Sequence, residues 1–162
     1  MFNVFLLFCI PFTIIWGIVF VWRWKKNPQT FYQDGKPFVF GHRGSPTHIT
    51  ENTLDSFEKA IDQGVDGIEF DIRLTKDGQM VIFHDSDLKR LAGRNKKIQD
   101  LTYKDLQEIQ LEQDQTVPLL NNFVPLFDKI KAVNIEIKSD GIFNGHGIVR
   151  PLINFLDKYN ID

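Results

Sequence analysis

The sequence predicts an α/β fold preceded by one N-terminal transmembrane helix. Residues 67–74 and 132–138 alternate apolar and charged side chains with the period of a β-strand. Before the first of these stretches, residues 54–61 keep apolar side chains at helical spacing and follow a short apolar strand at 38–40, so that strand, loop, helix and strand follow one another as a βα unit. Residues 2–22 contain no charged side chain.

The uncharged stretch at the N-terminus has the length of a membrane span. It reads FNVFLLFCIPFTIIWGIVFVW, and about 20 apolar residues cross a bilayer. Trp24 with Arg23, Lys25 and Lys26 resembles an aromatic belt with a positive flank, which favours a single-pass membrane protein whose remaining chain is cytoplasmic. A cleaved signal peptide is the alternative, but no basic residue precedes the run and no small-x-small cleavage site follows it.

The predicted organisation has three parts: an anchor with its basic flank at 1–26, a linker at 27–37, and one domain at 38–162. The chain has 162 residues, of which 43% are hydrophobic and 13% aromatic, and this is enough for one core. A net charge of -2 gives no indication of a nucleic-acid partner. The single cysteine, Cys9, excludes an intrachain disulfide and a Cys-rich metal site.

The domain begins with a short apolar strand at 38–40 that leads into Gly41-His42-Arg43-Gly44. Glycines on both sides allow the backbone to approach a ligand closely. His42 or Arg43 alone could be an ordinary surface residue. Together, at the end of a strand, they indicate a pair for phosphate binding and proton transfer.

Glu51 stands just before the helix that Asn52 is expected to cap and Gly64 to end. This position would direct Glu51 back toward His42. Glu51 could orient Arg43 or bind substrate, or it could simply interact favourably with the helix dipole.

The next pattern predicts a β-hairpin over 67–85. Glu69 and Asp71 share the charged face of its first strand. Asp77-Gly78 predicts a two-residue turn, and this register would place Asp71 opposite His84 with Cβ atoms about 5 Å apart. Like charges on one face repel each other, and a bound cation would remove the repulsion. An ordinary solvated strand face is the alternative.

The rest of the sequence continues the alternation of helices and strands. Residues 86–100 form a polar loop, which either lies over the site or is solvated. A capped short helix is expected from Thr102, and a helix with apolar positions at 123–130 precedes the strand 132–138. In that strand Glu136 and Lys138 would point the same way as the earlier carboxylates. An amphipathic helix is expected over 147–159.

Five motifs resemble the glycerophosphodiester phosphodiesterase family in order and spacing: GHRG at 41–44, ENT at 51–53, GIEFDIRLTKDG at 67–78, VIFHD at 81–85 and IEIK at 135–138. The resemblance implies a TIM-like (β/α)₈ barrel, which needs about 250 residues. We therefore expect only the N-terminal half of the barrel here. A fragment of a longer protein, a pair of half-barrels or an inactive product would each explain the length.

The resemblance also implies the roles of individual residues. Glu69, Asp71 and Glu136 would be metal ligands with His84 beside or on the metal; His42 and His84 would be the acid and base; Arg43, Glu51 and Lys138 would bind substrate. Oxygen ligands favour Mg²⁺ or Ca²⁺. The expected substrates are glycerophosphodiesters or membrane lysophospholipids, cleaved to a phosphomonoester and an alcohol.

Two other function classes remain open at this point. A non-catalytic, membrane-tethered interaction module, or a truncated inactive homologue, would fit the short length. A phospholipase C of the phosphoinositide-cleaving type also uses two histidines, and it would release a cyclic phosphate.

Overall fold

The structure is a computed structural model that describes residues 11–20, 36–139 and 146–161. The chain divides into two compact units, Met1–Pro37 and Phe38–Asp162. In the first unit, residues 11–20 form a helix. Among the described residues, no helix has both the length and the apolar character needed to cross a bilayer. This contradicts the predicted transmembrane helix and the single-pass localisation drawn from it; positions 2–10 and 21–26 of the predicted anchor and flank lie outside the described residues.

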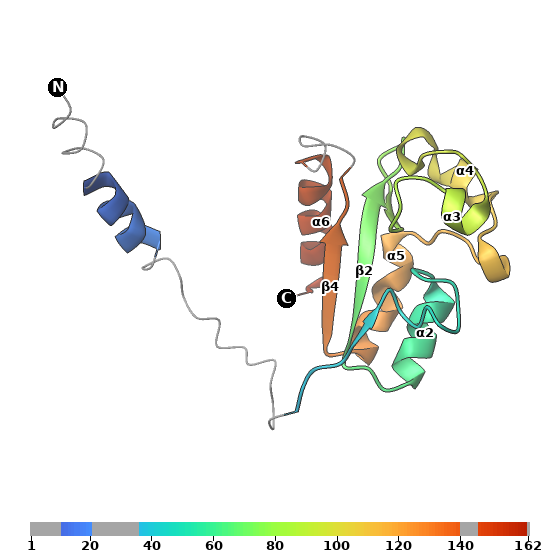
Figure 1. Ribbon diagram of the computed structural model, residues 1–162, viewed down its shortest axis with the longest axis horizontal. Coiled ribbons are helices and arrows are strands. Elements are labelled where there is room, and N and C mark those ends of the chain that lie inside the picture. The colour runs from blue at the N-terminus through green and yellow to red at the C-terminus, as the bar shows by residue number, and fades with distance from the viewer. Residues whose placement is uncertain (1–10, 21–35, 140–145, 162) are drawn as a thin grey trace. The chain divides into compact units, whose positions relative to one another are not determined.

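The second unit is built on a sheet of four strands, β1 (Phe40–His42), β2 (Gly67–Leu74), β3 (Met80–Ile82) and β4 (Ala132–Ile137). The long strand β2 is at its centre (Figure 1). β4 runs parallel to β2 along one edge. β1 pairs in parallel with the start of β2, and β3 pairs antiparallel with its end, so these two short strands follow each other along the opposite edge. The α/β prediction is confirmed.

Helices connect and cover the strands. They are α2 (Leu54–Asp62), α3 (Lys89–Ala92), α4 (Tyr103–Gln107), α5 (Leu120–Phe123) and α6 (His146–Tyr159), with 3₁₀ turns at Ile98–Asp100, Glu112–Asp114 and Val124–Lys129. Thr102 caps α4 in a capping box with Asp105, as expected from the sequence. The cap of α2 is Thr53, one residue after the predicted Asn52.

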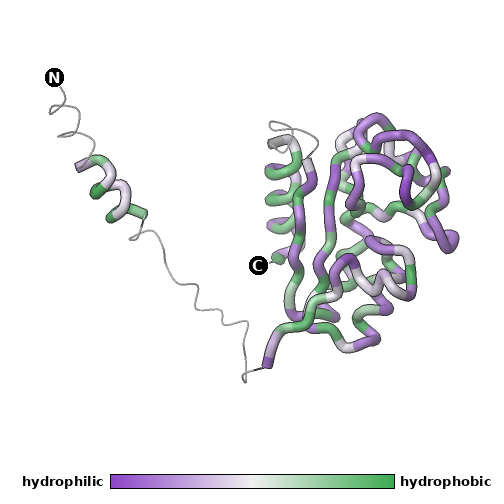
Figure 2. The backbone as a smooth tube through the Cα atoms, viewed as in Figure 1, coloured by the Kyte–Doolittle hydropathy of each residue, from purple (hydrophilic) through white to green (hydrophobic). Residues whose placement is uncertain are grey.

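The apolar face of β2 forms the main core. Ile68, Phe70 and Ile72 are fully buried there, with Phe57 from α2 and Phe123 from α5. Buried apolar residues of α6 complete the same cluster, and α6 lies beside β4 (Figure 1). Figure 2 shows hydrophobic residues recurring along the strands and along α6. Since side chains alternate along a strand, Glu69, Asp71 and Arg73 of β2 point to the opposite face.

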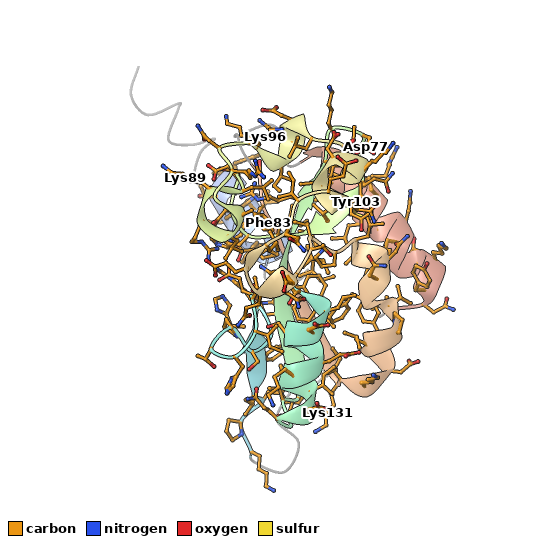
Figure 3. The ribbon with its side chains drawn as sticks, turned by 90° about the vertical axis from the view of Figure 1, so that its right-hand side faces the viewer. Asp77, Phe83, Lys89, Lys96, Tyr103 and Lys131 are labelled. Atoms are coloured by element: carbon orange, nitrogen blue, oxygen red, sulfur yellow. The ribbon has the colours of Figure 1, made fainter. Side chains whose placement is uncertain are left out.

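A second apolar cluster lies within residues 81–117. Its buried members are Val81, Phe83, Leu88, Leu91, Ile98, Leu101, Leu106, Leu111 and Val117. In Figure 3, Phe83 lies inside this segment, whereas Lys89 and Lys96 lie at its periphery. The segment that the sequence predicted as a polar loop, 86–100, therefore has apolar anchors in a small core of its own.

The hairpin register differs by one residue from the prediction. Ile72 lies opposite Ile82, and the amide of Phe83 donates to the carbonyl of Asp71 at 2.9 Å, so Asp71 does not lie opposite His84. The turn closes with the amide of Gly78 donating to the carbonyl of Thr75, and Gly78 has a φ of 75°. A left-handed residue after such a turn gives a three-residue loop in place of the predicted two-residue loop.

Candidate active site

The sheet register brings the predicted carboxylates together. In the parallel pairs His42 lies opposite Glu69, and Asp71 lies opposite Glu136. Residues opposite each other in a sheet project to the same face, as do residues two apart in one strand. Carboxylate oxygens of Glu69, Asp71 and Glu136 consequently lie within 4.8 Å of one another. The expectation that Glu136 points the same way as Glu69 and Asp71 is confirmed.

Asp71 is the most enclosed member of this carboxylate cluster, with no exposed surface. Its Oδ2 accepts a hydrogen bond from Nδ2 of Asn52 at 2.9 Å and lies 3.3 Å from Nε of Arg43. Its Oδ1 lies 3.1 Å from Nζ of Lys138 but accepts no hydrogen bond from the described residues. Buried charge is tolerated only when it is compensated, and two cations and one amide supply the compensation here.

Asn52 is a site residue that the sequence interpretation missed, since it was assigned only a capping role. It is buried and its backbone has a φ of 58°. Asparagine accepts this left-handed conformation more readily than most residues. The conformation directs the amide group to Asp71, and the only sequence signal for it was the position of Asn52 inside the ENT motif.

The surroundings of Glu69 disfavour the charged form of its carboxyl. Burial raises the pKa of its carboxyl, and the negative charge of Asp71 raises it further; the charges of His42 and Arg43 and a hydrogen bond from the Arg43 amide offset part of this. Nε2 of His42 lies 3.6 Å from Oε2 of Glu69, and the His42 side chain is 68% exposed. His42 is therefore accessible from solvent while it remains beside the carboxylate cluster.

Lys138 follows β4 and completes the positive charge on this face. Its Nζ donates to a carboxylate oxygen of Glu136 and lies close to Asp71. Burial alone would lower the pKa of Lys138, but its close contacts with the carboxylates of Glu136 and Asp71, and the negative charges of both, outweigh burial and raise the pKa. Lys138 therefore stays protonated.

His84 lies beside this group, in an open cleft of about 740 Å³ that Arg73 and Lys138 also line. Because β3 ends at Ile82, the strand register does not direct the His84 side chain. Nδ1 of His84 lies 2.7 Å from Oδ1 of Asp85. The carbonyl oxygen of His84 accepts from Nε of Arg73 at 2.9 Å and from its Nη2 at 2.7 Å.

Arg73 is a second residue whose contribution was not foreseen, although it shares the charged face of β2 with Glu69 and Asp71. The described cluster of possible metal ligands contains three carboxylates and does not include His84. The structure thus brings together His42, Arg43 and Lys138 around the carboxylates, and His84 reaches the same region through the cleft that it shares with Lys138.

Glu51 pairs with two arginines. It accepts from Nη1 of Arg43 at 3.0 Å, and from Nη1 and Nη2 of Arg90 at 3.0 and 2.6 Å. Burial alone would raise the pKa of Glu51, but the hydrogen bonds and charges of Arg90 and Arg43 outweigh burial and lower it. Its contact with Arg43 has the geometry that an orienting role requires. The partner Arg90 was not singled out from the sequence.

The donor set suits a hard divalent cation. Three carboxylates supply oxygen ligands only, as Mg²⁺ and Ca²⁺ prefer. One feature besides the donor set fits a cation at this place: the pKa of Glu69 is raised by burial and by the negative charge of Asp71, whereas Oδ1 of Asp71 already has the ammonium of Lys138 at 3.1 Å. Arg43 and Lys138 next to these carboxylates could bind an anion such as a phosphate.

Comparison with known proteins places this site in a family. The model of the "Glycerophosphoryl diester phosphodiesterase family" matches residues 42–153. A glycerophosphodiester phosphodiesterase of Caldanaerobacter subterraneus subsp. tengcongensis is 35% identical over 135 residues, which cover 78% of this chain and 55% of the relative. A human lysophospholipase D is 33% identical, over 74% of this chain and 40% of the relative.

Solved structures agree with this assignment. The glycerophosphodiester phosphodiesterase of Thermotoga maritima is 36% identical with a TM-score of 0.62, covering 76% of this chain and 51% of that one. An Oleispira antarctica phosphodiesterase, solved with its product sn-glycerol-3-phosphate, is 28% identical with a TM-score of 0.68, covering 76% and 53%.

These neighbours support the TIM-barrel-like α/β fold that the motifs implied. The chain spans about half the length of the first curated relatives that it matches. The family match covers more than half of the chain, and it includes four of the five motifs in full and all but the first residue of GHRG. The chain belongs to the glycerophosphoryl diester phosphodiesterase family.

Proposed function

We propose that the protein is a metal-dependent phosphodiesterase that uses water to cleave glycerophosphodiesters or lysophospholipids into a phosphomonoester and an alcohol. The observation that carries the proposal is the convergence of three carboxylates, His42 and two cationic side chains on one face of the sheet. The relatives named glycerophosphodiester phosphodiesterase and lysophospholipase D support the two substrate classes.

Glu69, Asp71 and Glu136 would hold the metal, Mg²⁺ or Ca²⁺. When bound, such an ion neutralises charge on the phosphodiester and polarises its phosphoryl oxygen. Arg43 and Lys138 would bind the remaining phosphate oxygens, because both carry fixed positive charge beside the carboxylates. Glu51 would hold Arg43 in place for this contact.

His42 and His84 would move the protons. One imidazole takes a proton from the attacking water, and the other gives a proton to the alkoxide that leaves. Each such transfer typically contributes about 10²- to 10⁴-fold to the rate. Asp85 would accept a hydrogen bond from Nδ1 of His84. In the neutral imidazole, Nε2 of His84 would then be the nitrogen that faces a reacting group.

Turnover of a defined substrate tests the proposal. The purified protein is incubated with glycerophosphocholine or a lysophospholipid and Mg²⁺ or Ca²⁺, and phosphomonoester release is measured with and without a chelator. We expect metal-dependent release that His42→Ala and Glu69→Ala each abolish. His48→Ala is the matched control, since His48 is exposed and the hydrogen bonds of its ring go to Ser45 and Thr47.

The products also separate the other function classes. If either site variant retained most of the activity, the residue assignment would be refuted. Release of a cyclic phosphate would select the phosphoinositide-type phospholipase C. Absence of both metal binding and turnover would favour a non-catalytic interaction module.

A further inference from the structure

A continuous chain of charged contacts links the loop that follows His42 at the end of β1 with the loop that carries His84. Arg43, next to His42, contacts Glu51 at 3.0 Å. Glu51 contacts Arg90 at 2.6 Å, and Arg90 contacts Asp85 at 2.7 Å. Asp85 then contacts Nδ1 of His84 at 2.7 Å. The contact between Glu51 and Arg90 joins residues 39 positions apart in the sequence, so this chain of contacts depends on the tertiary fold.

Arg90 is the central residue of this chain of contacts, and its hydrogen-bond donors are engaged on both sides. Nε donates to Oδ2 of Asp85, while Nη1 and Nη2 donate to the two carboxylate oxygens of Glu51. A guanidinium binds a carboxylate with two parallel hydrogen bonds and can still use Nε for another acceptor. Arg90 is therefore committed to two protein carboxylates and is poorly placed to bind a substrate phosphate as well.

The backbone that carries Arg90 is anchored independently of these contacts. Arg90 lies in the short helix α3, and the neighbouring Leu88 and Leu91 are buried in the second apolar cluster. An anchored guanidinium can hold Asp85 in one position. Asp85 in turn holds the imidazole of His84, while Arg73 holds the His84 carbonyl oxygen from the sheet.

The contact with Asp85 selects one tautomer of His84. An ionised carboxylate can only accept hydrogen bonds, so in the neutral imidazole Nδ1 carries the proton and Nε2 is the acceptor. Without Arg90, the carboxylate of Asp85 would lose one of its two fixed partners and could rotate away from the imidazole. The orientation and the tautomer of His84 would then both become heterogeneous.

We propose that Arg90 is a positioning residue that fixes His84, through Asp85, relative to the Glu51–Arg43 pair on the other loop. Its catalytic consequence rests on the function proposed above, whereas its effect on His84 does not. Arg90 touches neither substrate nor metal in this role. Its removal should impair the proton-transfer step and leave substrate binding close to normal.

The test compares Arg90→Gln and Arg90→Lys with the control Arg94→Gln in the full-length protein. Arg94 is exposed in the same segment and lies outside the chain of contacts. Misplacement of a catalytic group by about 1 Å can cost about 100-fold, so we expect kcat to fall by about 10- to 100-fold in Arg90→Gln, with KM changed by less than about threefold. Lysine can pair with only one of the two carboxylates at a time, so Arg90→Lys should be intermediate.

The second measurement is independent of turnover. Nitrogen-15 NMR of the histidine rings should show His84 with its proton on Nδ1 in the wild-type protein and in Arg94→Gln. In Arg90→Gln the His84 ring nitrogens should shift toward a mixture of tautomers, while the signals of His48 should stay in place.

The outcomes separate the two proposals. Unchanged His84 signals in Arg90→Gln would overturn the positioning role whatever the activity, and so would a raised KM with unchanged kcat, because that is the pattern of a substrate-binding residue. A wild-type protein without turnover would refute the proposed function, but the NMR comparison would still decide whether Arg90 positions His84.

Discussion

Glu69→Gln should change stability in opposite directions with and without a divalent cation. Burial and the charge of Asp71 raise the pKa of Glu69 in the folded protein. The folded state thus binds this proton more tightly than the unfolded chain, and without metal the stability falls as the pH rises above 4.5, the ordinary value. Glutamine removes the charge and should stabilise the metal-free protein at pH 7.

The size of the effect follows from the carboxylate geometry. Two unit charges at most 4.8 Å apart repel by at least about 3 kcal/mol at an effective dielectric constant of about 20. His42 and Arg43 already offset part of this for Glu69, so we expect a net gain of about 1 kcal/mol in the metal-free variant. In the wild-type protein, a cation at 100 times its Kd should add about 2.7 kcal/mol, or about 10 °C in Tm.

Thermal unfolding measured by circular dichroism, with a chelator and then with Mg²⁺ or Ca²⁺, provides the assay. Glu69→Gln should have the higher Tm in chelator and should lose most of the metal-induced increase. Glu58→Gln is the control, since Glu58 is an exposed glutamate on α2, and both of its Tm values should match the wild type. An undiminished metal effect in Glu69→Gln, or a loss of stability in chelator, would refute the electrostatic interpretation.

Three further predictions concern the residues around the site. Asn52→Ala should lower the free energy of unfolding in urea by about 3 kcal/mol, because it removes the buried hydrogen bond to Asp71 and strains a backbone with a φ of 58°. Asn52→Gly should lose only the hydrogen-bond contribution, because glycine adopts this backbone conformation without strain. Equal losses in the two variants would contradict this. Gly44→Ala should prevent stable folding, because the φ of Gly44 is 87° and a Cβ there would lie 2.5 Å from a side-chain oxygen on α2. Gly64 has a φ of 83° but open space around it, so Gly64→Ala should lower the free energy of unfolding by only about 1 kcal/mol. The lowered pKa of Glu51 contributes stability that is present above pH 4.5 and lost as the pH falls through the folded pKa. Glu51→Gln should therefore lose less stability on acidification than the wild type. An unchanged dependence of stability on acid pH would show that the ion pairs with Arg43 and Arg90 do not stabilise the fold.

The strand patterns could be predicted because side chains alternate with a fixed period. Glu69 and Asp71 had to share a face, and Glu136 joined them once β4 paired with β2 in parallel. The hairpin register could not be predicted with the same certainty. The register depends on whether Gly78 is a central residue of a two-residue turn or the left-handed residue that follows the turn in a three-residue loop. An Asp-Gly pair is compatible with both.

The contacts between loops could not be predicted from sequence patterns. The pair of Glu51 with Arg90 spans 39 residues, and Arg90 stood in a segment predicted as a polar loop that either lies over the site or is solvated. Its position depends on the second apolar cluster, in which Leu88 and Leu91 belong to α3 and its cap, whereas Ile98 lies in a separate 3₁₀ turn because the left-handed Gly93 ends α3. The role of Asn52 was hidden for a related reason, because a left-handed backbone leaves no periodic signal.

The small core under residues 81–117 restricts how a ligand could enter the cleft. A flap that swings open must first release the contacts beneath it, and here nine buried apolar side chains would be exposed to water. This side of the cleft, which Asp85, Lys89 and Arg90 line, therefore rests on a packed core and not on a movable flap. Under the function proposed above, adaptation to a different alcohol group would therefore replace exposed side chains at the cleft, such as Lys89, and leave the nine buried ones intact.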